Sequence, residues 1–427
     1  MLIDFAVANF RSIRDRQELS MVALDKDESI ALTEIPGAHL KALPAVGIFG
    51  PNASGKSNIL HALNFMIQAV RLSHQRWLPG QKIKRSPFLL DSASRGGPTT
   101  FEVDIVVDNI HYQYGFSCDD DTFLSEWLHS YPEGRVRRIF HRTGDDIKFG
   151  PHFSGPRKSI ARLVRPNSLF LSAAAANNHA QLSPVYEWFG RDCRVAIEGN
   201  NSGRLEETLH LLDHEVSRRT ILRLIEFADF GIRDVRISRH DVSPEEGRRI
   251  ADALRILQVD EIDIDPADIL LRPEIELVHA VEDGEGVLPL EVESSGTQTW
   301  LEFVGPVFTT LVSGGVLVVD EIDARLHPLL TGHLVKLFQD SVTNSKGGQL
   351  LFNSHDVTLL GPNAPARLRR DQVWLTEKNR AGATVLYPLT EYRVRDGLDN
   401  VERSYLKGRY GGVPFIDESL VSTISEA

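Results

Sequence analysis

The sequence has very little cysteine. Cys118 and Cys193 are its only two, and neither has a second cysteine at CxxC spacing. This excludes a disulfide scaffold and a cysteine zinc site, and it fits a reducing compartment. Long apolar runs are also missing, because glycines, a proline and hydroxyl residues interrupt the most apolar stretch, 304–319. No segment is therefore expected to span a bilayer. The first residues show no basic region followed by an apolar one, so we expect no signal peptide and a cytoplasmic protein.

Positive charge is in deficit. The chain carries 47 Lys and Arg against 59 Asp and Glu, for a net charge of −12. The whole molecule therefore has no field that attracts nucleic acid. Basic residues do gather locally at 71–85, 135–142 and 157–165, but solvated surface charge is the commoner explanation for such clusters. DNA stays open as a partner.

Repeats, low-complexity tracts and long heptad runs are absent as well. What is present is an alternation of strand and helix patterns. Strands are predicted at 3–7, 45–49, 316–319 and 349–352, helices at 58–70 and 300–311, and a mostly antiparallel β-layer between 100 and 148. The segment 151–285 has more helical periodicity, which indicates an insertion that splits one α/β unit.

We therefore predict an α/β fold with a mixed sheet, an antiparallel β-layer and a helical insertion, without a long coiled coil. Residues 1–150 would form the first half of the α/β unit together with the β-layer. Residues 151–285 would form the mainly helical insertion, and 286–427 the second half of the α/β unit.

The strongest local motif follows the predicted strand 45–49. Residues 50–57 match G-x-x-x-x-G-K-[ST], with a strand before the motif and a helix after it, as a phosphate-binding loop requires. Backbone N–H groups and the helix N-terminus would face the phosphates. Lys56 would neutralise them and Ser57 would bind Mg²⁺. The predicted nucleotide-binding residues here are Gly50, Asn52, Ala53, Ser54, Gly55, Lys56, Ser57 and Asn58.

A second apolar strand, 316–319, ends in Asp320 and Glu321. Such a strand end lies at the ligand edge of a parallel sheet. Asp320 would therefore contribute to the Mg²⁺ site, and Glu321 would act as general base on the attacking water. The alternative is a structural strand with a solvated acidic end.

Two weaker features narrow the prediction. Ser294, Ser295, Gly296 and Thr297 form a short polar loop before the predicted helix 300–311, and His355 directly follows the strand 349–352. The loop could be a simple helix cap, and a lone histidine is more often structural. Their order, with P-loop, polar loop, acidic strand end and histidine, is nevertheless typical of ABC ATPases. There the polar loop contacts the γ-phosphate of the opposite subunit, and the histidine contacts the γ-phosphate and water. We therefore predict an ABC-type P-loop ATPase head, with the P-loop in its first half, 1–150, and the other three features in its second half, 286–427.

Several further segments resemble ABC-clade ATPases related to RecF, SMC and OLD proteins, and most closely the compact AAA-type ATPases of bacterial anti-phage and abortive-infection loci. They lie at 9–12, 167–172, 293–297, 320–328, 370–374 and 405–411. The resemblance implies that Arg11 lies near the nucleotide and that 323–327 forms the D-loop at a dimer seam. His327 departs from the aspartate of many SMC-like proteins. No clear Q-loop glutamine is found, with 84–88 as the expected place.

The resemblance implies an ATPase that uses ATP and Mg²⁺, acts as a homodimer or higher homo-oligomer, and switches a co-encoded effector, a nuclease or toxin, in anti-phage defence. OLD nucleases carry a C-terminal metal-binding domain with paired carboxylates, which this chain lacks after His355. Two alternatives remain: a RecF-like DNA-repair clamp, and a nucleotide-gated scaffold with little turnover.

His210 and His214 are spaced as a metal-binding pair on one face of a helix. No third metal ligand is obvious, so the pair fits a solvated helix face.

Overall fold

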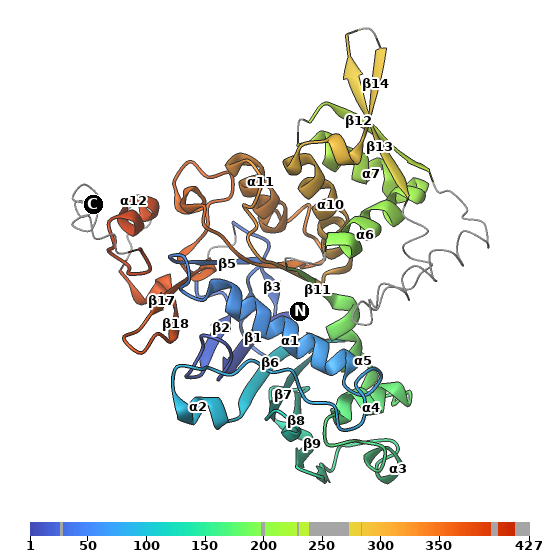
Figure 1. Ribbon diagram of the computed structural model, residues 1–427, viewed down its shortest axis with the longest axis vertical. Coiled ribbons are helices and arrows are strands. Elements are labelled where there is room, and N and C mark those ends of the chain that lie inside the picture. Colours follow the sequence, from blue (N-terminus) through green and yellow to red (C-terminus); the bar gives the residue numbers. More distant parts are fainter. Residues whose placement is uncertain are drawn as a thin grey trace, which may run out of the picture. The chain divides into compact units, whose positions relative to one another are not determined.

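The computed structural model describes residues 1–25, 29–197, 201–228, 230–238, 273–282, 284–393 and 400–414 (Figure 1). The chain forms two compact units. Unit 1 comprises Met1–Asn200 and Thr309–Ala427, and unit 2 comprises Asn201–Phe308. The three-part division at residues 150 and 285 stays a prediction. The acidic run 260–265 lies outside the described residues.

A six-stranded sheet forms the first layer of unit 1. Its order is β11-β15-β16-β5-β17-β18, in which only β18 is antiparallel to its neighbour. The strands are β5 (Ala45–Phe49), β11 (Cys193–Ala196), β15 (Val316–Val319), β16 (Gln349–Asn353), β17 (Val373–Lys378) and β18 (Thr384–Pro388). All residues of β5, β15 and β16 are buried, as expected for strands covered on both faces. The predicted mixed sheet is confirmed.

A seven-stranded antiparallel sheet forms the second layer, in the order β10-β9-β8-β7-β6-β1-β2. Its strands are β1 (Leu2–Ala8), β2 (Gln17–Ser20), β6 (Thr99–Val107), β7 (Ile110–Cys118), β8 (Phe123–Tyr131), β9 (Arg137–Thr143) and β10 (Asp146–Phe149). This confirms the antiparallel β-layer predicted between residues 100 and 148. A separate two-stranded sheet pairs β3 (Thr33–Glu34) with β4 (Lys41–Ala42).

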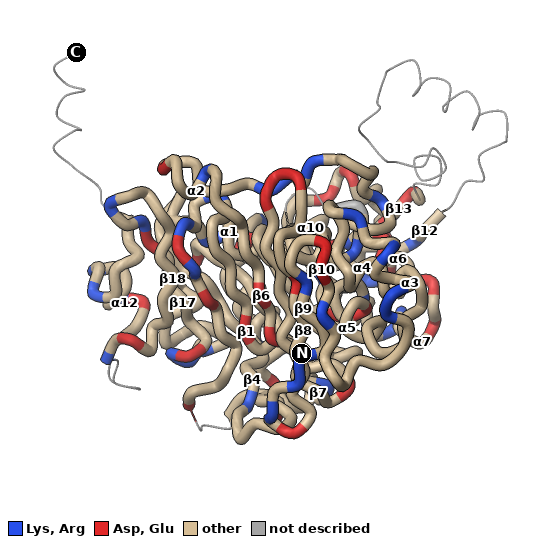
Figure 2. Tube along the Cα trace, turned by 90° about the horizontal axis from the view of Figure 1, so that it is seen from below, with Lys and Arg blue, Asp and Glu red and all other residues tan. Residues whose placement is uncertain are grey.

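The basic clusters predicted from the sequence are partly internal. Arg85 is 9% exposed and pairs with Asp120 at 2.7 Å. Arg142 is 1% exposed and donates to the carbonyl of Ser168. Arg165 donates to three backbone carbonyls near the end of α1. Basic and acidic residues are interspersed along the described backbone (Figure 2). Each cluster thus contributes one arginine to internal bonding rather than to an external basic surface.

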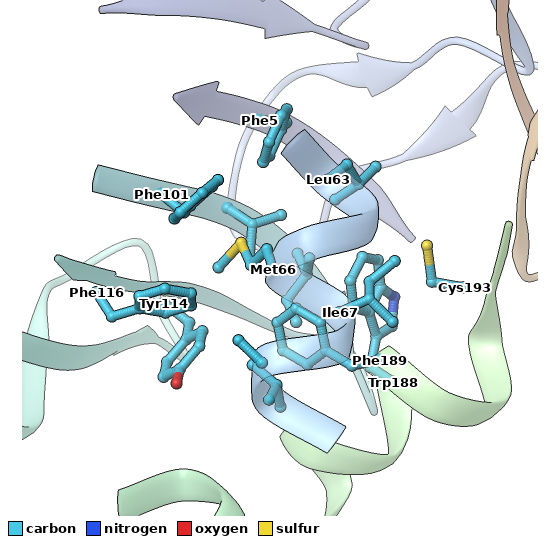
Figure 3. Close-up of a cluster of buried hydrophobic side chains, with 14 of the residues drawn as sticks. Phe5, Leu63, Met66, Ile67, Phe101, Tyr114, Phe116, Trp188, Phe189 and Cys193 are labelled. Atoms are coloured by element: carbon cyan, nitrogen blue, oxygen red, sulfur yellow. The ribbon is translucent and has the colours of Figure 1, made fainter. Parts of the chain in front are cut away.

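Helix α1 (Lys56–Leu72) packs between the two sheets, against β1 and β6 on one side and β16 on the other. Its apolar residues recur at helical spacing and are buried, which confirms the helix predicted at 58–70. Leu63, Met66 and Ile67 lie among aromatic side chains of the β-layer and the segment before β11 (Figure 3). This packing fixes the N-terminal end of α1, where the P-loop ends.

The other helices of unit 1 are short. They are α2 (Ser92–Gly96), α3 (Lys158–Ala161), α4 (Phe170–Ala176), α5 (Ser183–Glu187), α11 (Pro328–Gln339) and α12 (Val401–Leu406), with η1 (Trp188–Asp192), η3 (Val357–Leu360), η4 (Arg370–Gln372) and η5 (Leu389–Glu391). His327 acts as the N-cap of α11, because its Nδ1 accepts from the Leu329 N–H at 3.2 Å. The histidine therefore does the capping that an aspartate could also do here.

Among the described residues, unit 2 combines helices with a small sheet. Helix α6 (Asn201–Asp213) is followed by α7 (Glu215–Glu226), the antiparallel strands β12 (Ile232–Ser238), β13 (Glu274–Val281) and β14 (Gly284–Pro289), and η2 (Leu290–Val292). Helix α10 (Ser295–Ser313) begins in this unit and ends in unit 1. It confirms the helix predicted at 300–311.

The segment predicted to be mainly helical also contains strands. Strand β11 belongs to the main sheet of unit 1, and β12 and β13 belong to unit 2. These strands were not predicted from the sequence, since β11 has only four residues, two of them only half-buried. None of the helices that the structure describes is both long and apolar enough to cross a membrane.

Candidate functional site

The P-loop connects β5 to α1, as the sequence predicts. Gly50, Ala53 and Gly55 all adopt positive φ angles, of 153°, 61° and 108°. Gly55 tolerates no side chain, because a Cβ there would lie 2.1 Å from Thr384 Oγ1. These conformations wrap the loop around the N-terminus of α1, whose first N–H groups have no partner within the helix. The local sequence thus produces an anion-binding turn.

A pocket of about 390 Å³ opens on this loop. Its lining brings together most of the residues predicted for the site: Asn52, Ala53, Ser54, Gly55, Lys56, Ser57, Asn58, Glu321 and His355. Glu321 and His355 come from the ends of β15 and β16, far along the chain from the loop. Gly50, at the start of the loop, is not among the lining residues.

Lys56 lies beneath the loop and is 4% exposed. Its ammonium donates to the carbonyls of Gly50 at 2.8 Å and Pro51 at 3.2 Å, and lies 3.4 Å from His355 Nδ1. Burial lowers the pKa of Lys56 to about 8, while the carboxylates of Asp323, Glu321 and Asp320 oppose that shift. The site therefore contains a desolvated cation directed at the loop, which suits a phosphate.

Asp320 and Glu321 follow β15 and differ in burial and in the direction of their side chains. Asp320 is half-buried, and its Oδ2 lies 3.8 Å from His61 Nε2. Burial is the main cause of the lowered pKa of His61. Glu321 is exposed and has a φ of 53°, in the left-handed region. The chain turns sharply here, so one carboxylate stays beside Ser57 and α1 while the next lines the pocket.

Asn353 joins these residues, although it was not predicted from the sequence. Its amide nitrogen donates to Asp320 Oδ1 and to Ser57 Oγ at 3.2 Å, and its oxygen accepts from the Glu321 N–H at 2.6 Å. A signal was present: like Asp320, Asn353 is a polar residue at the carboxyl end of a buried parallel strand.

Two threonines from the β17–β18 hairpin were not predicted either. Thr376 and Ser54 share a hydroxyl hydrogen bond of 2.6 Å. Thr384 donates to the Ser54 carbonyl at 2.7 Å and bonds the Ser12 hydroxyl at 2.7 Å. Nothing in the sequence around either threonine indicates this contact with the P-loop.

Arg11 lies beside the P-loop rather than in the pocket. Its guanidinium is 3.4 Å from Asn58 Oδ1, and its φ of 48° is another left-handed conformation. The segment expected to hold a Q-loop, 84–88, packs against the same residue, because the Arg11 N–H donates to the Ser86 carbonyl. Arg11 and residues 85–90 line a second, larger pocket of about 640 Å³.

The polar loop 294–297 belongs to unit 2. Ser294 Oγ accepts from the Thr297 N–H at 3.1 Å and so caps α10. Ser294 and Ser295 are exposed, Gly296 is half-buried, and Thr297 is 4% exposed. The preceding Glu293 contacts His279 Nε2 at 2.6 Å. The loop is thus both a helix cap and an exposed N-terminus with small residues.

The ligand chemistry fits Mg²⁺ better than a transition metal. Ser57 and Asp320 offer hard oxygen ligands next to a phosphate-binding loop, the combination that Mg²⁺ prefers.

The rings of His210 and His214 lie 4.7 Å apart. Within the described residues, no group of three His, Cys, Asp or Glu side chains is placed to hold a metal ion on its own.

A family model matches most of the chain. The family model described as "AAA domain, putative AbiEii toxin, Type IV TA system" matches residues 45–361, which include the P-loop, the polar loop, Asp320, Glu321 and His355. No curated protein matches the chain.

Two solved structures are similar to the chain, each covering 91% of this chain and 97% of its own. One is an Smc head bound to the C-winged helix domain of ScpA, with 14% identity and a TM-score of 0.43. The other is an Smc head domain with an extended coiled coil bound to the C-terminal domain of ScpA derived from Pyrococcus furiosus, with 12% identity and a TM-score of 0.36.

Proposed function

The chain belongs to the AAA-domain family whose description names AbiEii, and on that premise we propose that it binds ATP with Mg²⁺ and hydrolyses it in the P-loop pocket. The observation that carries the proposal is the pocket itself. It places a phosphate-binding loop opposite Glu321 and His355, the two groups expected to act on water and the γ-phosphate.

Each residue has a distinct role in this proposal. Lys56 leaves the Gly50 and Pro51 carbonyls to neutralise the β- and γ-phosphates, and Ser57 and Asp320 would hold Mg²⁺, which would offset the charge of the phosphate oxygens. Glu321 accepts a proton from water as the water oxygen attacks the γ-phosphorus and the bond to the bridging oxygen breaks. His355, an exposed residue of the pocket lining, contacts the γ-phosphate and responds to its loss.

A second copy of the chain would complete the site. Ser294 and Ser295 are exposed at the N-terminus of α10, where free N–H groups favour an anion. We place this loop over the γ-phosphate of the partner copy, so that ATP joins two heads and hydrolysis releases them. The chain would then be a homodimer or part of a higher homo-oligomer.

The biological output we propose is control of a separate, co-encoded effector in anti-phage defence. The family description associates this domain with a type IV toxin–antitoxin system, which provides a class of partner. The DNA-clamp alternative has less support, since Arg85, Arg142 and Arg165 form internal hydrogen bonds. A steep salt dependence of DNA affinity would favour the clamp.

Glu321→Gln tests the proposed hydrolysis. Loss of the general base should lower the rate of ATP hydrolysis by about 10²- to 10⁴-fold. Bound ATP should persist, because the variant keeps the P-loop and the Mg²⁺ ligands. Phosphate release and retention of radiolabelled ATP on a filter are the measurements. Glu187→Gln, an exposed carboxylate of α5 paired with Arg191, is the matched control. Unchanged hydrolysis in Glu321→Gln would reject the role.

A further inference from the structure

Asn353 ends β16 and is fully buried, with 0% of its surface exposed. Its side chain makes hydrogen bonds to three parts of the pocket: Ser57 in the P-loop, Asp320 at the end of β15, and the backbone of Glu321. Among the described residues, these are the two predicted Mg²⁺ ligands and the predicted general base. One amide thus contacts both proposed metal ligands and the backbone of the proposed general base.

The orientation of this amide follows from its neighbours. The Glu321 N–H can only donate, so it must face the Asn353 oxygen. An ionised Asp320 carboxylate can only accept, so it must face the Asn353 nitrogen. The reverse orientation would place two donors together and two acceptors together. The Ser57 hydroxyl accepts the second N–H of the same nitrogen at 3.2 Å.

This arrangement leaves the ligand oxygens directed for metal binding. Asp320 uses Oδ1 for the amide, while its Oδ2 lies 3.8 Å from His61 Nε2, beyond hydrogen-bond distance, and so keeps lone pairs for a cation. Ser57 accepts from the amide through one lone pair, so a second lone pair is available for a cation. Both oxygens bond the same nitrogen atom, so their separation is set before any metal arrives.

The same residue supports the backbone of Glu321. A φ of 53° is unfavourable for a residue with a Cβ. The Glu321 N–H is held by Asn353 Oδ1, and the next N–H, of Ile322, donates to the Asn353 carbonyl at 3.2 Å. Asn353 therefore stabilises the turn that separates the Asp320 carboxylate from that of Glu321.

We propose that Asn353 is a positioning residue that fixes Ser57 and Asp320 as a ready-made Mg²⁺ site and holds Glu321 in its left-handed turn. The inference rests on the proposed function and adds to it the residue that organises the site. Asn353 acts through its neighbours and touches neither the nucleotide nor the water. Such outer partners of metal ligands typically contribute about 10- to 100-fold to metal affinity or activity.

The test is metal affinity in the full chain with a non-hydrolysable ATP analogue, using Mn²⁺ as the probe and electron paramagnetic resonance as the readout. Asn353→Ala should weaken Mn²⁺ binding by about 10- to 100-fold. Affinity for the analogue in EDTA should stay unchanged, because Lys56 and the loop N–H groups do not depend on the amide. Asn353→Thr keeps one hydroxyl donor and should lie between Asn353→Ala and the wild type.

Asn344→Ala separates positioning from stability. Asn344 is also buried, at 3% exposure, and also binds backbone groups, namely the Phe338 carbonyl and both backbone groups of Gly348. It lines no part of the P-loop pocket. Its loss should lower the melting temperature and leave Mn²⁺ affinity unchanged. If Asn353→Ala does not fold, the Mn²⁺ affinity of Asn353→Thr tests the positioning role instead.

The outcomes distinguish the two proposals. Equal Mn²⁺ affinity in the wild type and in the folded Asn353 variants would overturn the positioning role and leave the proposed ATPase intact. Equal loss of Mn²⁺ affinity in Asn344→Ala would overturn it too, since the effect would then be general destabilisation. A wild-type chain that binds no nucleotide with or without the metal would remove both proposals.

Discussion

At the scale of single residues, several unfavourable backbone conformations lie in or near the proposed ATP site. Ala53 in the P-loop, Glu321 after β15 and Arg325 four residues later have φ angles of 61°, 53° and 64°. Arg11, beside the P-loop, has a φ angle of 48°. Such conformations persist only where surrounding contacts impose them. The hydrogen bond that the Glu321 N–H donates to the Asn353 side chain is one such contact.

Asp4 provides a test of electrostatics in the β-layer. It lies in β1, where burial is the main cause that raises the pKa of its carboxyl from 3.8 to about 6, and Asp104 and Glu18 add to the shift. The folded chain then binds more protons than the unfolded chain between these two values, so its stability falls as pH rises through that window. At neutral pH the ionised carboxylate is a net cost.

Asp4→Asn should therefore stabilise the chain at pH 7.5 by about 1–3 kcal/mol, since one pKa unit corresponds to about 1.4 kcal/mol. The gain should disappear near pH 4, where the wild-type carboxyl is protonated in the folded state. Urea unfolding at both pH values measures this difference, with Asp15→Asn as the exposed control, at 64% side-chain exposure. A gain of equal size at both pH values would contradict the assignment.

The sequence predicted the residues of the site that belong to continuous motifs. Of the predicted residues, Asn52 to Asn58, Glu321 and His355 line the pocket, and a motif or a strand end marks each of them in the sequence. Asn353 was missed although its place at the end of a buried strand was a signal. The two threonines of the β17–β18 hairpin were missed because their roles depend on contacts with Ser54, more than 300 positions away, which no pattern in one sequence specifies.

At the scale of elements, the β17–β18 hairpin supports the outer side of the P-loop. Thr376 bonds the Ser54 hydroxyl and donates to the Phe49 carbonyl, and Thr384 donates to the Ser54 carbonyl. Both partner residues, Ser54 and Phe49, are buried, with 1% of each exposed. The hairpin lies beyond the segment 45–361 that the family model matches, yet it contacts the P-loop, which lies within that segment.

Replacing both threonines by valine should loosen the P-loop. Valine keeps the shape and removes the hydroxyls, each of which contributes about 0.5–1.5 kcal/mol when hydrogen-bonded. Affinity for ATP, measured by titration calorimetry, should fall by about tenfold, which corresponds to about 1.4 kcal/mol. Ser73→Ala, which removes a buried hydroxyl at the opposite end of α1, is the control and should leave ATP affinity unchanged. Equal losses in both variants would reject a specific role for the hairpin.

Element prediction succeeded where burial is complete and failed where it is partial. Strands β5 and β15 were predicted with their observed bounds, because each is a continuous apolar run before a turn. Strand β11 was missed because its Arg194 and Val195 are only half-buried and its parallel partner, β15, lies far along the chain. Its place in the main sheet depends on tertiary pairing rather than on local pattern.

At the scale of the whole molecule, the proposed reaction needs residues from both compact units. The P-loop, Asp320, Glu321 and His355 belong to unit 1, and the polar loop 294–297 belongs to unit 2. We propose that this loop serves the pocket of a second copy. ATP then acts as the link between two chains, and its hydrolysis changes the state of the assembly that controls an effector.

Mixing two inactive variants tests whether two chains share each ATP site. Lys56→Ala disables the P-loop of its own chain, and Ser294→Arg blocks the loop that would complete the partner's site. Each variant alone should hydrolyse almost no ATP. A mixed dimer contains one intact site, formed by the P-loop of the Ser294→Arg chain and the polar loop of the Lys56→Ala chain. If sites are shared, the mixture should regain ATP hydrolysis. Background hydrolysis in the mixture, with mixed dimers verified by native mass spectrometry, would show that the sites are not shared.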